Sequence, residues 1–123
     1  IVMVFLHTLR VFFTGAYKKP RELNWVVGVL MFFILMGLGF TGYLLPWDMK
    51  AYFATVVGLQ MAESVPIIGT LIKTLLSGDP EIVGAQTLTR FFAIHVFFLP
   101  AALLGLMAVH FIMIRRQGIA GPL

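Results

Sequence analysis

Residues 25–47, WVVGVLMFFILMGLGFTGYLLPW, form a long apolar run that contains no charged side chain. A transmembrane helix needs about 20 such residues to cross the hydrocarbon core of a bilayer. Trp25 and Trp47 stand at the ends of the run, and tryptophan is enriched at membrane–water interfaces. The run therefore predicts one transmembrane helix.

Two further apolar runs flank this one, and together they indicate a membrane protein. Residues 87–114 are long enough to span, and Pro100 lies inside them; a kink there is tolerated where neighbouring groups satisfy the freed carbonyl. Residues 1–15 would rise only about 22 Å as a helix, so we expect the end of a span that begins upstream. The chain is 60% hydrophobic and 11% charged, too apolar for an ordinary soluble domain.

The segment between the second and third runs, residues 48–86, has a different character. It mixes charged residues with apolar stretches of about 10 to 14 residues, which are too short to span a bilayer. This pattern predicts short amphipathic helices lying at the membrane interface. We expect them to be broken at Pro66 and at residues 78–80.

The distribution of basic residues predicts the orientation of the chain. If the three runs alternate in direction, residues 16–24 and 115–123 share one side, while residues 48–86 hold two lysines against four acidic residues. The positive-inside rule then puts the two end segments in the cytoplasm. The basic residues on that side are Lys18, Lys19, Arg21, Arg115 and Arg116. The formal charge of +4 does not indicate nucleic acid, because the basic residues are few and split between segment ends.

All three histidines of the chain, His7, His95 and His110, fall within the apolar runs. Ionisable residues at membrane depth are costly and usually functional, although a neutral histidine bonded to a carbonyl is the alternative. His7 and His110 lie close to the cytoplasmic ends of different helices, so they can face each other. His95 precedes His110 by fifteen residues, about 22 Å along a helix and about 60° beyond four full turns. The pattern predicts two stacked sites, one in each half of the membrane.

The residue types favour haem over zinc at these sites. Zinc prefers four close ligands, usually including thiolates or carboxylates, and the chain contains no cysteine. Two facing imidazoles suit a haem with bis-histidine ligation. His95 would need a partner about fourteen residues upstream of His7, beyond the given sequence.

Two further features are compatible with haem, and each also has a structural explanation. Arg10 follows His7 by three residues on the same helical face and could pair with a haem propionate or extend to the interface. Gly28 and Gly42 lie fourteen residues apart on one face of the second run. They could admit a flat macrocycle or allow close helix packing.

Several long motifs resemble the cytochrome b family along the whole chain. They are HTLRVFFTGAYKKPRELNW, GYLLPWD, VPIIG, and TLTRFFAIHVFFLP running to IRRQGIAGPL. The histidine spacing of fifteen, KKPREL and QGIAGPL look like its cytochrome b6 type, while Trp47 in GYLLPWD and MAE near residue 62 look like its bacterial menaquinol–cytochrome c reductase branch. The resemblance implies an all-α transmembrane fold. The chain would be one incomplete domain, residues 1–123, forming part of a four-helix haem-binding bundle. It would contain the end of the second helix, the third and fourth helices, and amphipathic interfacial helices between the last two.

The resemblance also implies roles for individual residues. His7 and His110 would ligate the iron of a b-type haem on the cytoplasmic side, and His95 would supply one ligand of a second haem on the outer, positive side. The remaining implied residues are Arg10 and Arg90 near propionates, Gly28 and Gly42 against the haems, and Tyr52, Phe53, Ala54 and Val56 at the border of the quinol pocket.

The function implied by the resemblance is that of a di-haem electron-transfer subunit in a quinol-oxidising complex of the cytochrome bc or b6f type. It would carry electrons across a bacterial cell membrane between quinol oxidation and quinone reduction, coupled to proton translocation. The complex would be a quinol–cytochrome c or plastocyanin-type oxidoreductase, and this chain alone would not be competent. A covalent c-type haem would be attached upstream of the chain.

The implied partners are a Rieske iron–sulfur protein, a separate subunit that completes cytochrome b, and a c-type cytochrome, in a homodimeric complex. Two other readings remain open from the residues alone. The chain could belong to a non-redox transporter, or to a structural membrane scaffold with buried histidines. Haem absorbance of the intact subunit separates these possibilities.

Overall fold

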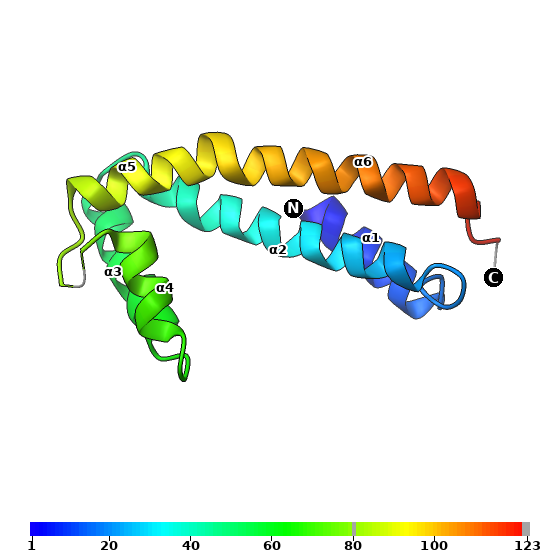
Figure 1. Cartoon of the computed structure of the whole chain (residues 1–123), viewed down its shortest axis with the longest axis horizontal. Helices are drawn as coiled ribbons and strands as arrows, with labels where there is room; N and C mark the ends of the chain where they lie inside the picture. Colours follow the sequence, from blue (N-terminus) through cyan, green and yellow to red (C-terminus); the bar gives the residue numbers. More distant parts are fainter. Residues whose placement is uncertain (80, 122–123) are drawn as a thin grey trace. The chain divides into compact units, whose positions relative to one another are not determined.

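The computed structural model describes residues 1–79 and 81–121, and these residues form helices joined by turns, without a strand. Pro80, predicted to help break the interfacial segment, and residues 122–123 of the predicted cytoplasmic end lie outside the described residues. The elements in Figure 1 are α1 (Val2–Phe13), α2 (Glu22–Leu44), α3 (Met49–Glu63), α4 (Gly69–Ser77), α5 (Ala85–Ala93), a π-helix (Ile94–Phe98) and α6 (Leu99–Gln117).

Two stretches of helix are long and apolar enough to cross a membrane. They are Glu22–Leu44, of 23 residues, and Ala85–Gln117, of 33 residues. Very few of their large apolar side chains are buried within the described part of the chain. This outward apolar surface suits a membrane protein, because lipid and neighbouring helices can cover it.

The chain divides into two compact units. The first contains residues 1–36 together with the described residues from Pro100 onward, and the second contains Gly37–Leu99. Each unit holds one part of α2.

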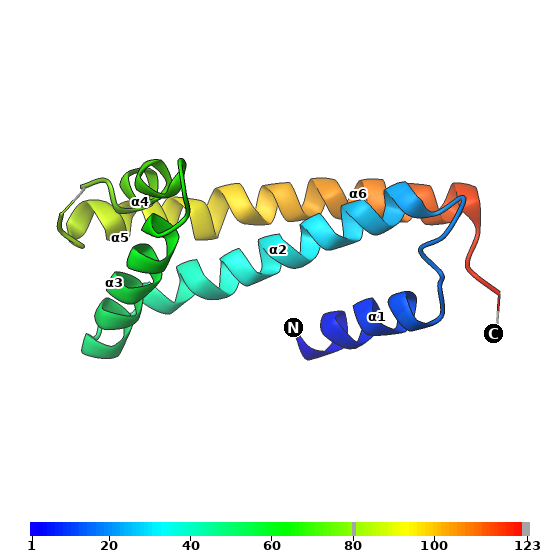
Figure 2. The same cartoon turned by 90° about the horizontal axis from the view of Figure 1, so that it is seen from below.

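In the first unit, α1 and the first part of α2 run antiparallel, joined by the polar link (Figure 2). Tyr17 in the link stacks on Phe12 at 5.9 Å between ring centroids and lies 5.5 Å from the ring of Trp25. Arg21 donates hydrogen bonds to the main-chain carbonyls of Gly118 and Ile119, at 3.3 and 3.2 Å. The link and the C-terminal segment are therefore connected beside the beginning of α2.

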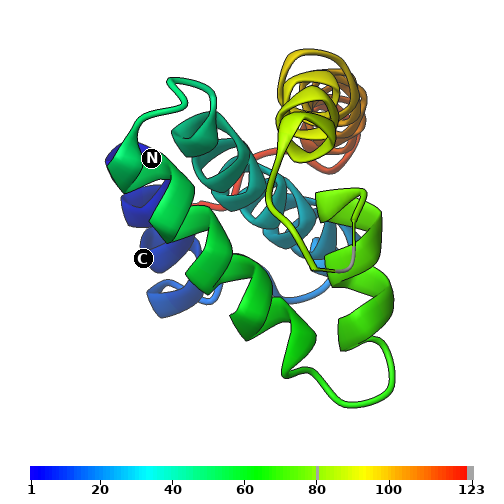
Figure 3. The same cartoon turned by 90° about the vertical axis from the view of Figure 1, so that its left-hand side faces the viewer.

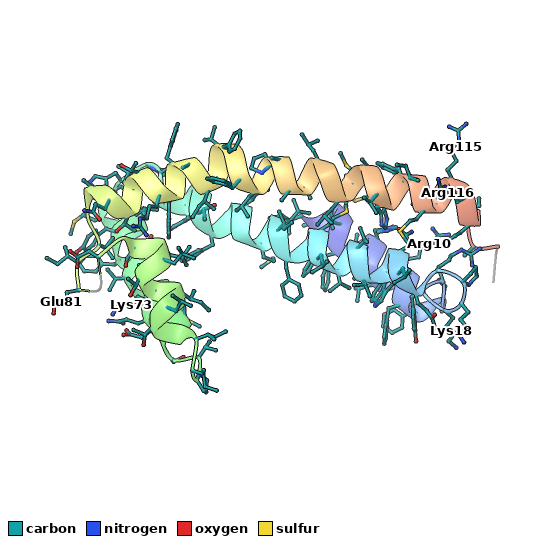
Figure 4. The ribbon with its side chains drawn as sticks, in the orientation of Figure 1. Arg10, Lys18, Lys73, Glu81, Arg115 and Arg116 are labelled. Carbon is teal, nitrogen blue, oxygen red and sulfur yellow. The ribbon has the colours of Figure 1, made fainter. Side chains whose placement is uncertain are left out.

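Basic side chains gather at this end of the first unit. Figure 4 shows Lys18 on the link and Arg115 and Arg116 at the end of α6 lying there. Their charges also suit the last turn of α6, since cations are favourable near a helix C-terminus.

In the second unit, α3 and α4 form a helical hairpin, and α5 packs on α4 (Figure 3). Asp48 caps α3 by accepting a hydrogen bond from the N–H of Ala51 at 2.8 Å. The ammonium of Lys73 on α4 lies 2.7 Å from the carboxylate of Glu63 on α3. The buried apolar residues at the centre are Leu44, Ala51, Leu59 and Phe91. These two short helices occupy the segment where the sequence predicts interfacial helices.

The last long helical stretch differs in detail from the sequence-based expectation. It begins at Ala85, and Thr87 accepts a hydrogen bond from the N–H of Gly84 at 3.1 Å. Instead of a simple kink at Pro100, the structure has a π-helix just before it, in which the N–H of Leu99 bonds the carbonyl of Ile94. Proline has no N–H and obstructs the carbonyl four residues earlier. A wider turn is one way in which a helix accommodates that loss.

Candidate functional site

A cavity of about 510 Å³ lies within the first unit. It is lined by His7 from α1, by Gly28 from α2 and by His110 from α6. Arg10 and Arg21 contribute positive charge to its wall. Its size is that of a typical cofactor or ligand pocket. The two histidines that the sequence predicts to face each other therefore share one cavity.

The ring of His110 lies against α2. A Cβ atom built on Gly28 would be 3.5 Å from Cε1 of His110, an ordinary van der Waals distance. The Nδ1 atom of His110 is buried and has no hydrogen-bond partner among the described residues. The side-chain oxygen of Asn24, one turn before Gly28, is also buried and unpaired within the described part of the chain. Two unpaired polar groups in an apolar cavity are typical of a site shaped for a ligand.

The second unit holds His95 in a different environment. A Cβ atom on Gly42 would lie 2.6 Å from Cε1 of this ring, closer than real side-chain contacts allow. The Nδ1 atom of His95 is 3.1 Å from the hydroxyl oxygen of Thr41. The residue at position 42 must therefore be glycine for the imidazole to take this place, and the neighbouring hydroxyl is within hydrogen-bond distance of the ring.

The two arginines that the sequence singles out have different surroundings. Arg10 is exposed at the wall of the first cavity and is labelled in Figure 4. Arg90 donates hydrogen bonds to the carbonyls of Thr74 and Leu75, at 3.2 and 2.6 Å. These are carbonyls near the end of α4, so the guanidinium stabilises the C-terminus of that helix. A role at a haem propionate stays a prediction for both residues.

The residues expected at a quinol pocket lie along α3. Tyr52 and Val56 line a cavity of about 140 Å³, whereas Phe53 and Ala54 are exposed. The structure therefore divides the four residues between a small cavity and the surface of the helix. Their role at a quinol site stays a prediction.

The donor set of the first cavity suits haem better than a bare metal ion. Among the described residues, no group of three or more histidine, cysteine, aspartate or glutamate side chains is placed to hold a metal ion. His7 and His110 offer two imidazoles, and Gly28 leaves the wall of the cavity free of a side chain. Two axial imidazoles are enough for a haem, because the macrocycle supplies the other four ligands of the iron.

Comparison with known proteins decides the family. The family model described as "Cytochrome b(N-terminal)/b6/petB" matches residues 1–123. This chain belongs to the cytochrome b family. The family is one of membrane proteins of electron transport that bind haem iron.

Individual relatives support the branch that the sequence motifs predict. The menaquinol:cytochrome c reductase cytochrome b subunits of Geobacillus thermodenitrificans and Bacillus subtilis are 84% and 82% identical to this chain over all 123 residues. Cytochrome b6 of Heliobacterium modesticaldum is 50% identical over the same residues. The chain covers 55% of each of the two reductase subunits and 57% of this cytochrome b6, so it spans about half the length of these relatives.

Two polar residues near the predicted ligands were not predicted from the sequence. Thr41 and Asn24 are both buried within a predominantly apolar helix, with relative exposures of 4% and 9%. A signal was present, since each lies on α2 close to a glycine already assigned to a haem. Thr41 adjoins Gly42, and Asn24 precedes Gly28 by four residues, one helical turn.

Proposed function

We propose that this chain is part of the di-haem electron-transfer subunit of a quinol-oxidising complex of the cytochrome bc or b6f type. In this role it carries electrons across the membrane between quinol oxidation and quinone reduction, coupled to proton translocation. The observation that carries the proposal is the shared cavity of His7 and His110, which come from separate helices and line it together with Gly28. The similarity to subunits named for menaquinol:cytochrome c reductase supports menaquinol as the donor.

The histidines would hold two b-type haems. His7 and His110 would be the axial ligands of one haem, and His95 would be one ligand of a second, whose other ligand comes from outside this sequence. Each b-type haem supplies a centre that takes up and releases one electron. The part of the protein is to fix the position and surroundings of these centres on rigid helices. Gly28 and Gly42 would leave room against the helix, and Arg10 and Arg90 would provide positive charge near propionates.

The quinol pocket and the partner subunits complete the proposal. Tyr52 and Val56, with Phe53 and Ala54 beside them on α3, would border the site where quinol is oxidised. A Rieske iron–sulfur protein would take one electron there, and a c-type cytochrome would receive it. A separate subunit would complete cytochrome b in a homodimeric complex. A covalently attached c-type haem would belong to the part of the protein that precedes this chain.

The proposed orientation in a bacterial cell membrane has residues 16–24 and 115–123 on the cytoplasmic side. The gathering of Lys18, Arg115 and Arg116 at one end of the first unit supports this orientation (Figure 4). The haem of His7 and His110 would then lie toward the cytoplasm. The His95 haem would lie toward the outer side.

Haem content of the intact complex tests the assignment. His7→Leu and His110→Leu should each remove one b-type haem, and the double variant should remove no more than either single one, because both ligands serve the same haem. His95→Leu should remove the other haem and add to the first loss. Thr8→Ala, on the wall of the same cavity, is the matched control and should retain both. Reduced-minus-oxidised spectra measure the result. Normal haem content in all three histidine variants would contradict the assignment of these ligands, and an intact complex without haem would point to a transporter or scaffold with buried histidines instead.

A further inference from the structure

We infer that Thr41 positions the imidazole of His95 and lowers the reduction potential of the haem that His95 binds. The inference rests on the proposed function for the identity of the cofactor. It assigns to Thr41 a role that neither the spacing of the histidines nor the family motifs indicate.

The hydrogen bonds of Thr41 determine the direction of its contact with His95. A threonine hydroxyl has one proton to donate and two lone pairs that accept. The hydroxyl of Thr41 donates to the main-chain carbonyl of Gly37 at 2.8 Å, the usual back-bond of a helical threonine. Its proton is committed there, so the contact of 3.1 Å with Nδ1 of His95 requires the imidazole to donate. His95 is therefore held as the tautomer that carries its proton on Nδ1.

This tautomer is the one that a metal ligand needs. With the proton on Nδ1, the lone pair on Nε2 is free to bind iron. The ring is also confined from the side, because Gly42 leaves it a place that a single added Cβ would fill at 2.6 Å. Hydroxyl and glycine are consecutive residues of α2, so one turn of that helix fixes both the tautomer and the position of the ring.

The same hydrogen bond changes the electronic character of the ligand. When Nδ1–H of a ligating histidine donates to an acceptor, the other nitrogen becomes more basic. A more basic ligand stabilises the oxidised form of the iron and lowers its reduction potential. The ring of His110 lies against Gly28 of α2 instead, so the hydroxyl of Thr41 acts on only one of the two haems and makes them unequal.

This inequality suits the proposed direction of electron flow. An electron that enters on the quinol-oxidising side reaches the His95 haem first and then passes to the haem of His7 and His110. A lower potential at the first haem makes that transfer favourable. Thr41 thus helps to direct the electron across the membrane without touching either the iron or the quinol.

Redox titration of the intact complex tests the inference, with the two haems distinguished by electron paramagnetic resonance. Thr41→Val removes the acceptor with little change in shape and should raise the midpoint potential of the His95 haem. Thr41→Ser retains a hydroxyl and should keep the original potential. The haem of His7 and His110 should be unchanged in both variants. Thr89→Val is the matched control, since the Thr89 hydroxyl is exposed and bonds the carbonyl of Ala85 in its own helix.

The possible failures have different meanings. If the complex contains no haem, the proposed function is wrong. If Thr41→Val keeps both haems and their original potentials, the function stands and the inference about Thr41 is wrong. If Thr41→Val loses the His95 haem, the haem content and midpoint potentials of Thr41→Ala are measured in the same way. Loss of that haem in both variants, together with its retention in Thr41→Ser, supports the positioning role, whereas its loss in Thr41→Ser as well contradicts it.

Discussion

Gly42 is the glycine at which an added side chain would collide with a histidine ring. The ring of His95 occupies the space beside Gly42, and a Cβ atom built on this glycine would lie 2.6 Å from Cε1 of the ring. We predict that Gly42→Ala displaces the imidazole, lowers the content of the His95 haem and destabilises the protein by about 1–3 kcal/mol, as overpacking usually does. Haem spectra and thermal denaturation of the complex measure the two effects.

Two other glycines of α2 provide matched controls for this prediction. A Cβ atom at Gly39 meets nothing within 4 Å, so Gly39→Ala should retain both haems. At Gly28 the added Cβ would lie 3.5 Å from His110, so Gly28→Ala should be milder than Gly42→Ala. Equal haem loss in all three variants would indicate that close approach to His95 is not the reason for the glycine.

Asp79 gives the turn between α4 and α5 a dependence on pH. Its carboxylate accepts hydrogen bonds from the N–H groups of Glu81 and Ile82, at 2.8 and 3.0 Å, and these bonds hold the pKa of Asp79 below its usual range. The stabilisation is therefore complete above the unfolded pKa of about 4 and disappears as the pH falls through the lower folded pKa. We predict that the amides of Glu81 and Ile82 lose hydrogen-exchange protection in that acidic window, after correction for intrinsic exchange rates.

Asp79→Asn is the control for this titration. The amide side chain keeps an acceptor oxygen at every pH. In this variant, protection of the two amides should therefore change no more between pH 5 and the acidic window than protection of amides in other turns. If Asp79→Asn and the unchanged chain lose protection in parallel, a different group controls the turn.

Among the elements, the π-helix Ile94–Phe98 has the most direct connection to function, because it contains His95. The missing N–H of Pro100 favours the wide turn. We predict that Pro100→Ala lets an ordinary α-helical hydrogen bond to the carbonyl of Val96 form, turning His95 away by up to about 100°, the angle of one residue. The resonance signal of the His95 haem should shift or weaken, while that of the other haem persists.

Leu99→Ala is a control for loss of apolar volume at the same place, and it should leave the π-helix intact because it retains its N–H. If Pro100→Ala and the unchanged protein gave identical spectra, Pro100 would not be the cause of the wide turn at His95.

The elements also show which parts of the site a sequence can predict. Charge and hydrophobicity vary over whole segments, so the two long apolar helices and the placing of His7 and His110 beside one cavity could be predicted from length and depth. The contact between Thr41 and His95 could not, because His95 lies in a π-helix. Helical periodicity assumes about 100° for every residue, and one π-turn shifts that register. The burial of Asn24 and the hydrogen-bond partners of Arg90 likewise depend on distances of a few ångströms, which helical periodicity does not predict.

At the scale of the whole molecule, the exposed surface matters more than the interior. Only Leu44, Ala51, Leu59 and Phe91 are buried apolar residues in the described part of the chain, and nearly all large apolar side chains of the two long helical stretches are at least partly exposed. A water-soluble chain could not leave so much apolar area uncovered. Lipid and neighbouring helices are therefore expected to provide most of the burial that stabilises these helices.

The orientation of the chain can be tested directly, because the sequence contains no cysteine. Single cysteines can be introduced at exposed positions of the polar segments, Lys19→Cys and Arg116→Cys on one side and Ser64→Cys and Glu81→Cys on the other. In intact cells, a thiol reagent that does not cross the membrane should label the second pair. In inverted vesicles, it should label the first pair, because the basic segments are expected in the cytoplasm. The chain without introduced cysteines, in the same complex, controls for labelling of other subunits. Labelling of Lys19→Cys from outside intact cells would reverse the proposed orientation, and with it the assignment of His7 and His110 to the cytoplasmic side.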